Sequence, residues 1–563
     1  MRLRPALLIT VPLALAAGWR VMALEAPASV RVHVTDAGTG QPLPCRLTLL
    51  DEHGGMAEIA PEKRPGLAIR PGVVYTGTGE ATFTLPRGRY TLYATRGLEY
   101  GLGQRVFQAG SETTDLRLKL PREVDTRGYI ACDTHIHTLT FSGHGDARIE
   151  ERMATIAGEG IELAIATDHN HHTDYAPVAR ATGTASHFTP VVGNEVTTKV
   201  GHFNAFPIRP GSRVPDDKLT DWAALLTEIR ATPGVRVVTL NHPADDHNGL
   251  TPDDPRRFHP ASGEALDGAP WSFDGIEVVT SAALQSDWTR TYRDWFALLN
   301  RGRRIVGLGS SDTHDVDRYI LGQARTYVAS RAERPDQIDV NEACDSILAG
   351  KVLVSMGLLT EAWVDGKYGV GELAPPAAGP MKLRVRVQGP RWVTADRLEV
   401  YANGEKIVDQ PITPKKGTVV KADVTLSLPR PRQDVWLVAI ATGPGVREPY
   451  WPISRPYQPT RGDWDPRLIG STSPIRIDAD GDGRYSSPAD YAGRVVEANA
   501  ADPKKLLAAL APYDAATSVQ AASLCRWKGL DLAAAPFRGA IENAPPQVRH
   551  GFIAYRNLLT TPK

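Results

Sequence analysis

Histidines and carboxylates with the spacing of metal ligands are concentrated in the middle of the chain. Of the 15 histidines in 563 residues, 12 lie between His135 and His314. Imidazole nitrogens and carboxylate oxygens together bind zinc, manganese and iron. The clustering therefore predicts a metal centre in this part of the sequence.

The first motif is His135-x-His137, which ends an apolar run. Residues two apart in a strand point to the same face, so both imidazoles can reach one ion, whereas Cys132 points to the other face. A second apolar run, 163–166, leads to His169, and the stretch between the two runs has the apolar spacing of a helix. These patterns predict a strand, a helix and a second strand, with histidines where the two strands end.

Four more polar motifs follow strand-like apolar runs in the same way. They are Gly193-Asn194-Glu195, Gly201-His202-Phe203-Asn204, Asn241-His242-Pro243 and Ser311-Asp312-Thr313-His314. One histidine in such a loop is usually a hydrogen-bonded structural residue. The set, however, brings up to six histidines and two carboxylates to one rim, which is enough for two or three divalent ions.

Strand-like and helix-like segments alternate from residue 128 to residue 360. The strand candidates are 129–137, 162–168, 189–195, 201–206, 235–241, 275–280, 304–309 and 325–329. Repeated strand–helix units predict a parallel barrel of the TIM type, in which functional residues lie where the strands end. The predicted fold class is therefore multidomain α/β plus β, with a TIM-like barrel at its centre.

The barrel region is flanked by segments in which apolar and polar residues alternate. This alternation predicts β-sandwich domains over 27–122 and 361–455. The first of them resembles carboxypeptidase-regulatory-like domains. The remaining segment, 456–563, becomes alanine-rich and is predicted to be helical.

Residues 1–23 have the features of a secretory signal peptide. A basic start is followed by a short apolar run and by small residues suited to cleavage. The run is shorter than the ~20 residues that a membrane span needs, so a membrane anchor is the weaker alternative. The sequence predicts an exported protein, periplasmic or extracellular, whose mature form does not insert into a membrane.

The order of the histidine and carboxylate motifs resembles that of the polymerase-and-histidinol-phosphatase (PHP) metallohydrolase superfamily. The stretch Glu195–Phe206 resembles its CehA/McbA-type branch, which includes carbaryl hydrolases. The resemblance implies a distorted (β/α)7 barrel with a bi- or trinuclear centre. It implies metal ligands at His135, His137, His169, Glu195, His202, His242, Asp312 and His314.

The resemblance also implies catalytic roles for four of these ligands, His169, Glu195, His242 and Asp312. The family usually supplies one more ligand soon after His-x-His. Here either His144 or Asp146 could serve, and we favour His144.

Other residues near the motifs are candidates for supporting roles. Lys199 lies between two expected ligands and could bind an oxyanion. His171 and His172 directly follow the second motif and could face the substrate. Asp168 and Glu277 are expected to orient metal-binding histidines as hydrogen-bond acceptors.

A separate acidic loop lies near the end of the chain. Asp478, Asp480 and Asp482, with a glycine after the second and third of them, match the start of a calcium loop. The twelfth position is Ala489 instead of glutamate. The loop is therefore either a structural calcium site or an acidic turn.

These patterns together predict an exported, metal-dependent hydrolase. Two or three divalent ions, zinc first and manganese or iron as alternatives, would lower the pKa of bound water toward ~7, and the hydroxide would cleave an ester-type bond. Few Arg or Lys residues lie near the motifs, which favours a carboxylic or carbamic ester or amide over a phosphoester.

Composition limits the other function classes. The 64 basic and 64 acidic residues cancel, which argues against nucleic acid as a partner, so the expected substrate is a small molecule. Four scattered cysteines give no disulfide framework. The alternative hypothesis is an exported glycan- or envelope-binding protein in which the barrel is a non-catalytic scaffold.

Overall fold

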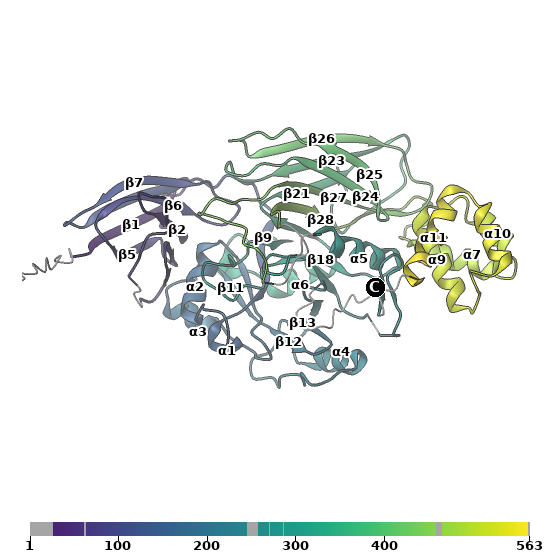
Figure 1. Ribbon diagram of the computed structural model, residues 1–563, viewed down its shortest axis with the longest axis horizontal. Helices are drawn as coiled ribbons and strands as arrows, with labels where there is room; N and C mark the ends of the chain where they lie inside the picture. The colour runs from purple at the N-terminus through teal and green to yellow at the C-terminus, as the bar shows by residue number, and fades with distance from the viewer. Residues whose placement is uncertain are drawn as a thin grey trace, which may run out of the picture.

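The computed structural model describes residues 26–60, 64–244, 257–269, 271–284, 287–457 and 464–560. The predicted signal peptide, 1–23, lies outside the described residues. Within those ranges, no helix has both the length and the apolar character needed to span a membrane. Along the colour gradient of Figure 1, an N-terminal β region leads to a central α/β region, a second β region and a helical C-terminal region.

The N-terminal β region consists of two sheets packed face to face. Alternate residues of its first strand are buried, as expected for a strand with one face on a core. The strand orders are β5-β1-β8 and β3-β4-β2-β6-β7. The bounds are β1 Ala28–Asp36, β2 Cys45–Leu50, β3 Leu67–Arg70, β4 Val73–Thr76, β5 Glu80–Leu85, β6 Gly88–Thr95, β7 Gly103–Ala109 and β8 Thr114–Leu120.

The central region contains two curled sheets whose strand ends carry the histidines. One includes β9 (Tyr129–Ile136), β10 (Leu163–Ala166), β11 (Thr189–Val192), β19 (Arg325–Ala329) and β20 (Val352–Met356). The other is ordered β12 (Asn194–Thr198), β13 (Gly201–Phe206), β14 (Val237–Leu240), β17 (Gly275–Thr280) and β18 (Val306–Ser310). Isolated bridges join Ile136 to Thr313 and His169 to Glu195, so the two sheets meet at the site.

Within the described part of this central region there are six α-helices. They are α1 (Leu139–Ser142), α2 (Ile149–Gly158), α3 (Ala176–Ala181), α4 (Trp222–Ala231), α5 (Thr289–Asn300) and α6 (Val340–Leu348). The longer ones bury one apolar face against the sheets. On α4, for example, the buried side chains are Trp222, Leu225, Leu226 and Ile229, which is the spacing of a single helical face.

The prediction of a distorted (β/α)7 TIM-like barrel is wrong. The described residues form 29 strands and only 11 α-helices, and the central strands lie in two mixed sheets instead of one closed parallel ring. Parallel neighbours need a crossover of about a dozen residues, yet only Lys199 and Val200 separate β12 from β13, which pair antiparallel. Likewise β19 is antiparallel to both β9 and β20. Apolar runs reveal strands but not strand direction, and this is the source of the error.

The second β region shares a sheet with the central region. Strand β20 pairs with β28 (Arg467–Thr472), which continues through β27 (Val435–Pro444) and β24 (Arg397–Ala402) to β25 (Glu405–Pro411). A three-stranded sheet, β21-β23-β26, covers this extension on top in Figure 1. The remaining bounds are β21 Leu359–Val364, β22 Leu373–Ala374, β23 Met381–Gln388, β26 Val420–Leu428 and β29 Ile475–Ile477.

Five helices with their own hydrophobic core close the chain, shown in yellow in Figure 1. They are α7 (Pro488–Asn499), α8 (Pro503–Ala509), α9 (Ala515–Trp527), α10 (Ala535–Glu542) and α11 (Pro546–Thr560). They dock on a small hairpin, β15 (Phe258–His259) and β16 (Glu264–Ala265), of the central region. Buried Glu264 accepts hydrogen bonds from Ser523, Arg526 and Tyr555 at 2.7 to 2.8 Å, which fixes the helices to that hairpin.

Candidate metal centre

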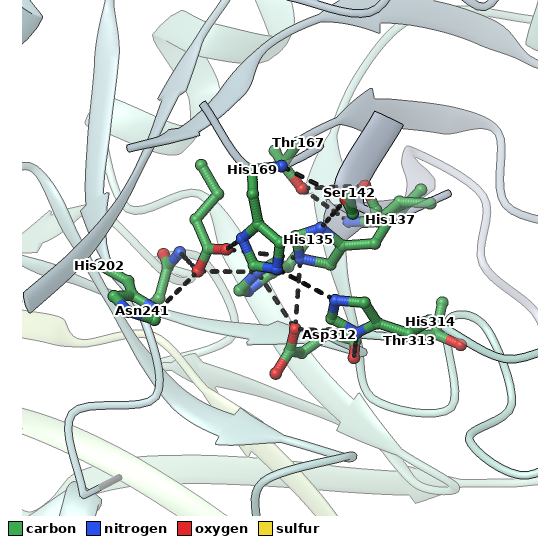
Figure 2. Close-up of polar contacts among 12 residues, drawn as sticks. His135, His137, Ser142, Thr167, His169, His202, Asn241, Asp312, Thr313 and His314 are labelled. Atoms are coloured by element: carbon green, nitrogen blue, oxygen red, sulfur yellow. Dashed lines mark hydrogen bonds and ion pairs between the residues drawn. The ribbon is translucent and has the colours of Figure 1, made fainter. Parts of the chain in front are cut away.

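His135 and His137 lie side by side in the interior where β9 ends (Figure 2). Their side chains are fully buried, and neither Nε2 atom has a hydrogen-bond partner among the described residues. Leaving a buried polar atom unsatisfied costs about 1–3 kcal/mol, so such atoms call for an explanation. Cys132 is packed in a hydrophobic cluster, as the strand alternation predicts.

Two carboxylates face these bare nitrogens. Asp312 Oδ1 lies 3.3 Å from Nε2 of both His135 and His137, and Glu195 Oε1 lies 3.2 Å from His135 Nε2. Tetrahedral zinc, with Zn–N near 2.0–2.1 Å, holds its ligand atoms about 3.4 Å apart. The spacing of these donors therefore fits a shared ion, and their chemistry suits a divalent cation.

Glu195 is the centre of the cluster. Its 1% exposed carboxylate lies 2.5 Å from His169 Nδ1, 3.3 Å from His202 Nδ1 and 3.4 Å from His242 Nε2. The side chains of Asn241 and Thr197 also donate hydrogen bonds to it, at 2.9 and 3.1 Å. A carboxylate among so many imidazoles would be a ligand of any divalent ion held there.

The donor atoms form three overlapping groups, in each of which all ligand atoms lie within 4.8 Å of one another. The groups are His135, Glu195 and His242; His135, His137 and Asp312; and His137, His169 and His314. His202 lies beside the first group, with its ring 5.1 Å from that of His242. The structure thus brings together the eight ligand positions that the motif order implied, with buried groups able to hold metal ions.

The sequence offers His144 or Asp146 as the extra ligand after His-x-His, with His144 favoured. Asp146 accepts hydrogen bonds from Arg70 at 2.9 Å and from the backbone N–H of Val316 at 2.7 Å, so its oxygens are occupied. His144 is exposed, and its ring stacks on those of His314 and His169 at 4.2 and 5.0 Å. Of the two side chains, that of His144 is the one that stacks on rings of the histidine cluster.

Carboxylates behind the histidines orient the rings. Glu277 lies 2.7 Å from His135 Nδ1, which directs Nε2 toward the cluster. Asp168 does not touch a histidine ring. It accepts a hydrogen bond from Ser142 Oγ at 2.8 Å, and Ser142 in turn lies 3.0 Å from His137 Nδ1.

The surroundings of His135 and His137 shift the pKa values of these two imidazoles in opposite directions. Burial alone would lower the pKa of His135, but the carboxylates of Glu277, Asp312 and Glu195 outweigh it and raise that pKa well above its usual value. Burial and two neighbouring histidines lower the pKa of His137 well below its usual value. Despite its burial, the pKa of Glu277 falls to about 2, chiefly because of His135.

The backbone is strained at the same place. Among the described residues, five non-glycine residues have positive φ, and Asn170 (φ 50°), His242 (φ 24°) and Asp312 (φ 53°) are three of them. Such conformations cost about 1–3 kcal/mol each and cluster at functional sites. Two of the three are candidate ligands, which supports a functional reason for this geometry.

The expected substrate-binding residues lie outside the ligand groups. Lys199 is exposed in the turn between β12 and β13. His171 stacks on Phe141 with ring centroids 4.2 Å apart. His172 Nδ1 lies 3.2 Å from the carbonyl oxygen of Ser212. Their substrate-binding role stays a prediction.

Several supporting residues were not found from the sequence. Ser142, Thr197 and Asn241 touch the cluster, and Tyr457 donates a hydrogen bond to Asp312 Oδ2 at 3.0 Å. Asn241 stands in the Asn-His-Pro motif, which could have drawn attention to it. Tyr457 is 145 residues from Asp312 in the chain, and no local pattern marks it.

The acidic loop near the end of the chain was expected to place Asp478, Asp480 and Asp482 together, but the carboxylates that lie together are a different set. Asp478 and Asp480 lie within 4.8 Å of Asp434, whereas Asp482 is outside this group. Asp434 is fully buried and comes from the end of the loop before β27. Its oxygens accept hydrogen bonds from the backbone N–H groups of Ala479 and Ser486 at 2.8 and 2.7 Å.

We expect calcium to raise the thermal midpoint of the protein by a few degrees through this loop. Ligand at a hundredfold excess over Kd stabilises by about 2.7 kcal/mol. Asp434→Asn should abolish the calcium effect, while Asp482→Asn should leave most of it. Differential scanning calorimetry with and without calcium measures this. An unchanged midpoint in the unsubstituted protein would identify the loop as an acidic turn.

Neither protein-family models nor curated protein sequences give a match to this chain.

Proposed function

We propose that the protein is a metal-dependent hydrolase that cleaves an ester-type bond in a small-molecule substrate. The observation that carries the proposal is the pair of buried Nε2 atoms of His135 and His137, without hydrogen-bond partners among the described residues and 3.3 Å from one oxygen of Asp312. A divalent cation at this point would bind both Nε2 atoms and the Asp312 oxygen together.

The residues that would hold two or three ions are those of the three donor groups. Glu195 would serve more than one ion because its two oxygens face different histidines, Oε1 toward His135 and His242 and Oε2 toward His169. Divalent ions bound there supply Lewis acidity and an activated water. Zinc suits the histidine-rich donor set best, and manganese and iron tolerate it.

The protein's own groups would control access and proton movement. His169 and His314 keep 20% and 14% of their side chains exposed, whereas His135 and His137 are sealed from solvent. His202 keeps 13% of its side chain exposed. A substrate would therefore approach from the side of His169, His202 and His314. His169, Glu195, His242 and Asp312 belong to the donor groups beside these rings, and we propose catalytic roles for them.

The surroundings favour a carboxylic or carbamic ester or amide over a phosphoester. Arg152 is a fully buried cation close to the cluster, but its guanidinium donates to the carbonyl oxygens of His137, Thr313 and Asp315. These guanidinium donors are therefore already used in hydrogen bonds to backbone carbonyl oxygens. A phosphoester would call for cations with donors to spare. The motif-level resemblance to the CehA/McbA-type branch of the PHP superfamily supports the same substrate class, and the N-terminal segment supports export.

Metal content is the direct test of this proposal. Mature protein would be purified, washed with a mild chelator, and analysed by inductively coupled plasma mass spectrometry. We expect two or three equivalents of zinc, manganese or iron. The loaded protein would then be screened against carboxylic esters, carbamates, amides and phosphoesters. Failure to retain any transition metal after reconstitution would contradict the hydrolase and favour a binding function.

A further inference from the structure

A segment from the second β region reaches over the candidate metal centre. The segment Pro452–Tyr457, here called the strap, follows β27 in the chain. Gln323 Nε2 donates to the carbonyl oxygen of Pro452 at 2.9 Å, and Ser454 Oγ donates to that of Arg318 at 2.6 Å. The backbone N–H of Tyr457 donates to the carbonyl oxygen of Ala282 at 3.1 Å. The strap is therefore attached to the central region along its length.

Tyr457, the last residue of the strap, touches a candidate ligand. Its hydroxyl donates to Asp312 Oδ2 at 3.0 Å, and its ring meets that of Tyr319 edge to face, with centroids 6.2 Å apart. The residue is 36% exposed, so it lies between solvent and the buried carboxylate.

The two oxygens of Asp312 thus have separate environments. Oδ1 faces His135 and His137, whereas Oδ2 is bound by the Tyr457 hydroxyl. A carboxylate with one oxygen hydrogen-bonded in this way offers the other as a single ligand atom. Asp312 also has a positive φ of 53°, a backbone conformation that few non-glycine residues adopt.

We propose that Tyr457 is a positioning residue of the metal centre: its hydroxyl holds Asp312 Oδ2 so that only Oδ1 is presented to the ions. This inference rests on the proposed function, because it assumes that Asp312 binds metal. Removing a hydrogen-bonding partner behind a ligand typically weakens metal affinity about 10–100-fold. The strap thereby makes the second β region a contributor to the site.

The test compares Tyr457→Phe with Tyr319→Phe. Both changes remove one phenol hydroxyl from the same aromatic pair, but the Tyr319 hydroxyl lies 3.5 Å from the carbonyl oxygen of Arg455 and does not contact a candidate ligand. Zinc dissociation constants would be measured by chelator competition, and the visible spectrum of the cobalt-substituted protein would report ligand geometry. We expect affinity to fall about 10–100-fold and the spectrum to change in Tyr457→Phe. In Tyr319→Phe we expect affinity within about twofold and the original spectrum.

A double-substitution cycle separates positioning from a general effect on folding. In the Asp312→Ala background, Tyr457→Phe should weaken zinc binding no further, because the partner of the hydroxyl is gone. Equal zinc affinity in Tyr457→Phe and the unsubstituted protein would overturn the inference and leave the hydrolase proposal standing. An equal loss in both backgrounds would also overturn it. Absence of metal binding by the unsubstituted protein would overturn both.

Discussion

Replacing His135 and His137 together with alanine is expected to abolish metal retention and all hydrolysis. Two of the three donor groups contain His135, and two contain His137, so each group loses at least one nitrogen. Both imidazoles are completely buried where β9 ends, so the variant loses two donors from the interior of the cluster. Metal content by mass spectrometry should drop below one equivalent, and turnover should drop to background.

The control for this prediction is the substitution of a histidine far from the site. His53 is exposed in the N-terminal β region, and His53→Ala should leave metal content and turnover unchanged. Circular dichroism checks that the double alanine variant is folded. Retention of a full complement of metal by a folded double variant would contradict the assigned ligands.

Glu195→Gln is expected to have a comparable effect with almost no change in shape. The carboxylate lies within 3.6 Å of five imidazoles, and an amide carries no charge and is a poor bridging ligand. We expect zinc affinity to fall at least about a thousandfold, equivalent to about 4 kcal/mol. Glu150→Gln, an exposed carboxylate on α2, is the matched control and should bind zinc normally.

The same substitution should change proton binding in the metal-free protein. Burial lowers the pKa of His169, but Glu195 outweighs it and raises that pKa above its usual value. Burial still lowers this pKa in the variant, and of the carboxylates that raise it only the weaker influence of Asp312 remains, so the pKa of His169 should shift downward and the ring should lose its proton at lower pH. An NMR titration of labelled histidines measures the shift. A pKa that does not move would mean that Glu195 is not the source of the perturbation.

The site could be predicted from the sequence much better than the fold that carries it. Histidines at the ends of apolar runs are a local signal, and it sufficed to locate His135, His169 and His242 in one cluster. Strand direction depends on how distant segments pair, and the sequence pattern of β12 and β13 is the same for parallel and antiparallel neighbours. The predicted barrel failed for this reason.

Contacts between distant segments were also beyond the reach of motifs. Tyr457 and Asp434 each join a cluster whose other members lie far along the chain, and neither has a neighbour that marks it as special. The domain divisions proposed from composition remain predictions. A single sheet nevertheless passes the division at residue 360, since β20 pairs with β28.

The pairing of β20 with β28 covers a strand edge that could otherwise associate with other chains. All five residues of β20 are buried in the finished molecule, and one of its edges is covered by β28, which is synthesised only after β21 to β27. Until then, Val352–Met356 can pair with β19 on one side but has a largely apolar, unpaired edge on the other, the kind of edge that associates with other chains. A protein truncated after residue 360 should therefore precipitate, and the refolding yield of the full chain should decrease as protein concentration rises.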